Sequence, residues 1–173
     1  MSQSAQELIG EADERGLAAS ALGCLDRCLP LLGDAVPAEL LRPLWCSVAE
    51  GGDGWADRLA QVRAALDAAG PGDGFGDDEA VLVRTMLGAA PSAWEGAALR
   101  EWAGACSLTA LDLHERLGGG PLVSGEERRQ VQVLEFLAGL AEGAPAGLRP
   151  VLDLSAEARR VLLAVVSRRA RGA

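Results

Sequence analysis

The sequence predicts an all-α fold, a single compact helical domain of about seven to eight helices over residues 1–173. Alanine and leucine dominate the apolar residues, whereas tyrosine and asparagine are absent and valine, isoleucine and threonine are together scarce. This composition favours helices over strands. Apolar residues recur at three- and four-residue steps, and a chain of this length buries roughly 70% of its unfolded surface. A core of that size needs no disulfide or metal for stability.

Two helices are expected in the first 30 residues. Ser4 and Glu7 form a capping box that opens a short helix, and Gly16 is its expected break. An apolar stripe then predicts a second helix from residue 17 that ends near Leu29 or Gly33, because Pro30 cannot sit deep inside a helix.

Three further helices are expected before the middle of the chain. Pro37 at a first-turn position predicts a helix over 37–50, and Asp53 is a good N-cap for the next one, over 54–69. The glycine-rich segment 70–77 is interpreted as a flexible connector. Its glycines follow no strand and precede three acids, so a phosphate site is disfavoured. A helix over 77–88 follows.

The longest predicted helix spans 92–117 and is expected to be the central element around which the others pack. Ser92 and Glu95 match a capping box after Pro91, and the segment 118–121 carries three glycines and a proline that stop the helix. At 1.5 Å per residue, about 25 residues give roughly 37 Å, enough to cross a small domain.

Two helices complete the prediction. Ser124 and Glu127 match a further capping box for a helix over 124–141, and Ser155 is the expected cap of a last helix over 156–170. Three prolines spaced 54 residues apart also suggest successive helical hairpins, although a true internal repeat and a coincidence both remain open: Pro37, Pro91 and Pro145.

The charge distribution is uneven. All 16 basic residues are arginine, which coding bias explains more simply than a need for bidentate anion contacts. Residues 1–80 hold 15 acids and 5 arginines, whereas residues 81–173 hold 10 acids and 11 arginines. An acidic front half repels phosphate backbones, so we expect no nucleic-acid partner. The longest apolar run, 161–166, is too short to span a membrane, and the N-terminus lacks a secretory pattern, so we expect a cytoplasmic protein without a membrane partner.

The cysteines and the single histidine are the residues whose chemistry could serve a metal or catalytic site. Cys24 and Cys28 share one helix face at a spacing that could chelate a metal, but all four cysteines fall on apolar stripes, and core packing is favoured. His114 has carboxylates beside it, as a general base would, yet no linear motif places a nucleophile or metal near it. No metal, cofactor or catalytic residue is predicted.

The remaining candidates are ligand or interface residues. Tryptophan and arginine are enriched at interaction sites, so these residues are the candidates, beside His114: Trp45, Trp55, Trp94, Trp102, Arg168 and Arg169. Core packing is the favoured interpretation of the tryptophans. The closing arginines can meet an acidic partner, or the acidic half of the same chain.

No coherent catalytic set is visible, so the sequence favours a non-catalytic protein-interaction or regulatory adaptor domain, whose partner is another protein or a second copy in a homodimer. Two alternatives remain open. One is a helical domain that binds a small ligand in a tryptophan-lined apolar pocket. The other is an antitoxin or immunity-type inhibitor whose acidic face covers a basic enzyme.

Overall fold

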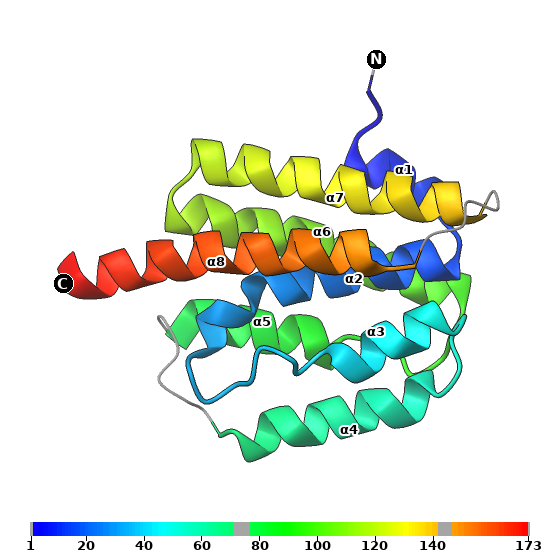
Figure 1. Cartoon of the computed structure of the whole chain (residues 1–173), viewed down its shortest axis with the longest axis horizontal. Coiled ribbons are helices and arrows are strands. Elements are labelled where there is room, and N and C mark those ends of the chain that lie inside the picture. Colours follow the sequence, from blue (N-terminus) through cyan, green and yellow to red (C-terminus); the bar gives the residue numbers. More distant parts are fainter. Residues whose placement is uncertain (1, 71–76, 142–146, 173) are drawn as a thin grey trace.

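The structure is a computed structural model that describes residues 2–70, 77–141 and 147–172. Within these residues it contains no strand, which confirms the predicted all-α class (Figure 1). The described ranges hold eight α-helices and one short 3-10 helix, η1, in this order: α1 (Ala5–Glu11), α2 (Glu14–Cys28), η1 (Leu29–Leu32), α3 (Arg42–Ala49), α4 (Trp55–Ala68), α5 (Asp77–Gly88), α6 (Gly96–Leu117), α7 (Gly120–Ala141) and α8 (Arg149–Gly172).

The most enclosed helix is α2. Every residue from Gly16 to Cys28 is buried, and α2 packs against α1, α3, α5, α6, α7 and α8. Small residues make this enclosure possible, because a helix with little side-chain volume allows its neighbours to approach closely. A Cβ added at Gly16, for example, would lie 3.7 Å from the Cβ of Leu137 on α7. The helix expected to be central, α6, is long and packs against α2, but α2 is the one covered on all sides.

The second half of the chain forms three long helices that reverse direction in turn. Figure 1 shows α6 and α7 antiparallel and α8 turning back again, with its C-terminal end extending past the other helices. The tight turn between α6 and α7 uses Gly119, whose φ of 66° is accessible to glycine at little cost. A helical hairpin therefore exists at this point. Pro145, the third proline of the suggested repeat, lies outside the described residues, as does 71–76 of the predicted connector.

Two of the three predicted capping boxes are wrong. The first is confirmed, since the Ser4 side chain accepts a hydrogen bond from the Glu7 backbone and Glu7 returns one to Ser4. Ser92, in contrast, lies in a non-helical bend, and α6 begins only after Glu95. The physical reason is tertiary, because residues 91–94 leave the helix to pack Trp94 against Trp55.

The last two helices begin earlier than predicted. Ser124 lies inside α7, which starts at Gly120, and Ser155 lies inside α8, which starts at Arg149. In both helices a proline falls at the second residue, where its missing N–H costs nothing. Because that proline supplies a start signal of its own, neither the Ser124–Glu127 pattern in α7 nor Ser155 in α8 is needed as a cap.

Three further boundaries differ from the sequence prediction. Asp13 caps α2 by accepting from the Gly16 N–H at 2.9 Å, so the helix break precedes Gly16 rather than falling on it. The helix expected from residue 37 begins at Arg42, after a run of turns. The N-cap of α4 is Gly54 in a left-handed conformation, not Asp53.

Arginine side chains satisfy the carbonyl groups at several helix ends. Arg63 on α4 donates to the Leu87, Gly88 and Ala90 carbonyls at the end of α5. Arg100 on α6 likewise reaches carbonyls at the end of α1. The last four carbonyls of a helix have no partner within it, and a guanidinium can serve several of them at once. The arginines therefore connect different helices, consecutive ones in the case of α4 and α5 and distant ones in the case of α6 and α1.

None of the helices in the described ranges is both long enough and apolar enough to cross a membrane.

Candidate functional site

A cluster of charged and polar side chains is buried where α2, α6 and α7 meet. Arg27 on α2 donates from Nε to Oε2 of Glu126 and from Nη2 to Oε1, each at 2.8 Å. The two side chains are 1% and 0% exposed. We call Arg27, Glu126, His114, Gln130 and Ser107 the buried polar cluster.

The other members of the cluster complete the coordination of Glu126. Gln130 donates to Oε1 of Glu126 at 3.1 Å and to the Ser107 carbonyl at 3.2 Å, and it accepts from the Ser107 hydroxyl at 2.6 Å. His114 lies with Nε2 3.7 Å from Oε2 of Glu126. Its Nδ1 is 2.6 Å from the Ala110 carbonyl oxygen, which can only accept, so Nδ1 carries a proton.

Two opposing effects set the pKa values of the buried groups: burial disfavours their charged forms, and pairing with an opposite charge favours them. Burial alone would raise the pKa of the Glu126 carboxyl, but the charge and hydrogen bonds of Arg27, with smaller contributions from His114 and Gln130, hold that pKa below its usual range. Burial also raises the pKa of the Cys24 thiol to about 12 and holds those of Cys28 and Cys106 well above the usual value. These thiols are therefore protonated and unreactive in the folded protein.

The buried polar cluster has the character of a structural element. Both oxygens of Glu126 already accept hydrogen bonds, and its side chain is fully enclosed, so neither solvent nor substrate reaches it in this conformation. Cys24 lies against it, with Sγ 3.7 Å from Nη2 of Arg27. Cys24 and Cys28 thus sit in the core, and among the described residues no group of three histidine, cysteine or acidic side chains is arranged to hold a metal.

The sequence singled out His114 as a ligand or interface candidate, whereas the structure buries it beside Glu126, and neither Glu126 nor Arg27 was among the candidates. Arg27 and Glu126 are 99 positions apart, and no local pattern links them. One signal was available, since Asp26 and Arg27 follow directly on residues 16–25, a run of small and apolar side chains that leaves the helix without a polar face.

The four tryptophans do not converge on one cavity. Trp55 packs edge-on against Trp94 and Trp102, with ring centroids 5.3 and 5.9 Å apart. The Trp55 and Trp102 indole N–H groups donate to the Pro91 and Met86 carbonyls, so both rings are fixed core elements. Trp45 lies elsewhere, and its indole N–H donates to Asp26 at 3.2 Å.

Trp45 is instead part of an open hollow between α3 and α8, which we call the α3–α8 groove. Its volume is about 600 Å³. The lining comes from α2, the turns before α3, α3 itself and the first half of α8: Asp26, Ala38, Glu39, Leu41, Arg42, Trp45, Cys46, Ala49, Leu148, Arg149, Leu152 and Arg159. Asp26 binds Arg159 as well as Trp45, and burial raises the pKa of the Asp26 carboxyl.

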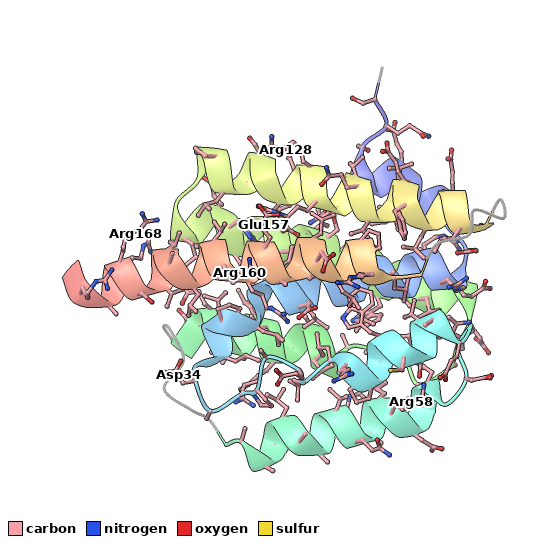
Figure 2. All side chains as sticks on the ribbon, in the orientation of Figure 1. Asp34, Arg58, Arg128, Glu157, Arg160 and Arg168 are labelled. Atoms are coloured by element: carbon pink, nitrogen blue, oxygen red, sulfur yellow. The ribbon has the colours of Figure 1, made fainter. Side chains whose placement is uncertain are left out.

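The closing arginines divide between internal and external roles. Arg159 binds Asp26 of the acidic front half, as one of the two sequence interpretations allowed. Arg168 and Arg169 are exposed near the end of α8 (Figure 2 labels Arg168). The outer α8 face, defined by Arg160, Leu163, Ala164, Ser167, Arg168 and Arg171, forms a shallow hollow on this helix.

No protein-family model, curated protein or solved structure matches this chain. The α3–α8 groove and the outer α8 face are accessible surfaces among the described residues, and their own side chains indicate what they can bind.

Proposed function

We propose that the chain is a non-catalytic protein-interaction domain, an adaptor or regulatory partner, that binds an acidic protein surface through the outer α8 face. The observation that carries this proposal is a contrast in accessibility. The buried polar cluster is sealed inside the bundle, whereas exposed apolar and basic side chains lie on α8.

The exposed apolar residues support this choice. Five large apolar side chains are exposed in the described ranges, and three of them lie on α8: Leu152, Val161 and Leu163. Of the three, Leu163 lies on the outer α8 face, on the helix whose C-terminal end extends past the bundle (Figure 1), and association can bury it there, whereas Leu152 lines the α3–α8 groove. Leu163 and Ala164 are flanked by arginines on the same face.

The charge of this face selects the partner. Arg160, Arg168 and Arg171 place three positive charges on the outer α8 face of a protein whose net charge is −9. Complementary charges speed encounter and exclude like-charged partners, and arginine is enriched where binding energy concentrates. An acidic partner surface is therefore favoured. A second copy offers one, since Asp57 and Asp67 are exposed on α4.

We further infer a cytoplasmic location. The four cysteines are all free, and three of them are buried in the core as thiols. Reducing compartments preserve this state, whereas secreted proteins of similar cysteine content usually form disulfides.

The test compares two exposed arginines that differ only in position, Arg168 on α8 and Arg128 on α7 (Figure 2). Partners captured by the wild-type chain are purified, and binding is measured by calorimetry at low and high salt. We expect Arg168→Glu to weaken binding roughly ten-fold or more and Arg128→Glu to leave it nearly unchanged.

Light scattering after size-exclusion chromatography, at the same two salt concentrations, reports a homodimer directly. A partner that binds both variants equally would overturn the assignment to α8. That outcome would instead fit an inhibitor that uses its acidic residues against a basic enzyme. A salt-insensitive monomer without any partner would overturn the interaction function itself.

A further inference from the structure

The α3–α8 groove is lined by both apolar and charged side chains. Leu41, Trp45 and Leu148 are buried side chains that line it, and Leu152 adds a partly exposed one. Its volume of about 600 Å³ lies within the range of small-molecule sites, roughly 300–1,000 Å³. The groove can therefore enclose the hydrocarbon part of a small ligand.

A fixed network holds the shape of this groove. Asp26 accepts from the Trp45 indole N–H and from Arg159, and Arg159 also donates to the Ala38 carbonyl at 3.0 Å. These bonds connect α2, α3, α8 and the turns before α3. A preformed site loses less entropy on binding than one that must be ordered by its ligand.

The charges of the groove favour an anion. Its lining holds three arginines and two carboxylates, which gives a net charge of +1 in a protein of net charge −9. Arg159 is already paired with Asp26, so two guanidinium groups remain for a ligand. Arg42 is exposed, and no side chain of the described residues pairs with its guanidinium, while Arg149 is 90% exposed and 4.0 Å from Asp153.

We propose that the α3–α8 groove binds a small amphiphile with one carboxylate and an unbranched hydrocarbon body, such as a medium-chain fatty acid. Arg42 and Arg149 contact the carboxylate, and the body lies along Trp45, Leu148 and Leu152. A single negative charge neutralises the lining, whereas a doubly charged phosphate ester exceeds its charge and meets Glu39. This inference does not depend on the interaction proposed for the outer α8 face.

The groove contains its own reporter of occupancy. Cys46 lines it and is exposed, whereas Cys24, Cys28 and Cys106 are buried. The rate of Cys46 alkylation by iodoacetamide is measured with increasing decanoate, below the concentration at which decanoate forms micelles. We expect saturable protection of Cys46 and a matching dissociation constant by calorimetry.

Variants and related probes decide which part of the ligand is recognised. Arg42→Gln/Arg149→Gln should weaken decanoate binding roughly ten-fold or more, while the matched control Arg128→Gln/Arg168→Gln, which removes the same charge elsewhere, should not. Leu152→Ser should also weaken it, and because Leu152 is partly exposed, this variant keeps the fold.

Four results would overturn the proposal. Equal binding of decanol would show that the charge is not recognised, and tighter binding of decyl phosphate would show that the head group is not a carboxylate. Protection of Cys46 by an acidic amphipathic peptide but not by decanoate would make the groove a peptide site. Absence of protection by any of these probes would also rule out the carboxylate ligand.

Discussion

Arg27 and Glu126, 99 residues apart in the chain, form two parallel hydrogen bonds of 2.8 Å in the middle of the helical bundle. Such a pair is costly to desolvate and is stable only while both partners are present. Its energetic role is therefore conditional, because each residue stabilises the fold by neutralising the other.

This dependence predicts a non-additive mutant cycle. Arg27→Met leaves the Glu126 carboxylate buried without its main partner and should lower the free energy of unfolding by about 3–5 kcal/mol. Glu126→Leu should be similarly damaging, because it strands the guanidinium. The double variant Arg27→Met/Glu126→Leu should be more stable than either single variant. Urea unfolding of all four proteins measures this, and simple addition of the two single effects would contradict the coupling.

Acid should remove the contribution of Glu126. Its folded pKa lies below the unfolded value of about 4.3, so the stabilisation is complete above that pH and is lost as pH falls through the folded pKa. Urea unfolding between neutral and acidic pH should therefore show the stability difference between wild type and Glu126→Gln shrinking below about pH 4.3.

Asp26 provides a comparison of opposite sign. Burial raises its folded pKa, so its contribution is complete below the unfolded pKa and is lost as pH rises through the folded one. The stability of wild type relative to Asp26→Asn should accordingly increase on acidification. If the stability of wild type relative to Glu126→Gln and relative to Asp26→Asn changed in the same direction as pH falls, the pH dependence would have another origin.

Gly52 should tolerate no side chain. A Cβ at this position would lie 2.6 Å from the Trp94 ring, and the φ of 105° is strained for other residues. Gly52→Ala should therefore lower the unfolding free energy by about 2 kcal/mol or more. Gly104→Ala, within α6 and with only an ordinary contact at 3.8 Å, should raise it by up to about 1 kcal/mol. Thermal and urea unfolding measure both variants, and an equal change in unfolding free energy for Gly52→Ala and Gly104→Ala would contradict this prediction.

Arg63 should be replaceable only in part by lysine. Its guanidinium serves three carbonyl groups at the end of α5, and a lysine ammonium lacks the planar fork. We expect Arg63→Ala to cost about 1.5–3 kcal/mol of stability and Arg63→Lys to recover less than half of it. The exposed Arg160→Ala is the control and should change little, so a similar loss there would argue against a capping role.

Periodicity and composition were enough to predict the helices, but they did not predict which helix the others enclose. Local signals succeeded where nothing distant competed, as at Ser4 and Glu7. The same pattern at Ser92 and Glu95 failed because Trp94 packs against Trp55, which is 39 residues earlier in the chain. The buried polar cluster and the α3–α8 groove were not predictable, since each joins residues whose proximity only the tertiary fold creates.

The enclosure of α2 has a consequence for synthesis of the protein. Its cover includes α6, α7 and α8, all of which follow it in the chain. Some 134 residues separate Cys28 from Leu162, a buried residue of α8, so at about 5–20 residues per second the ribosome needs on the order of ten seconds to produce that cover. During this interval the nascent α2 segment exposes leucines and cysteines that chaperones can bind, and folding is completed only after α8 has left the ribosome.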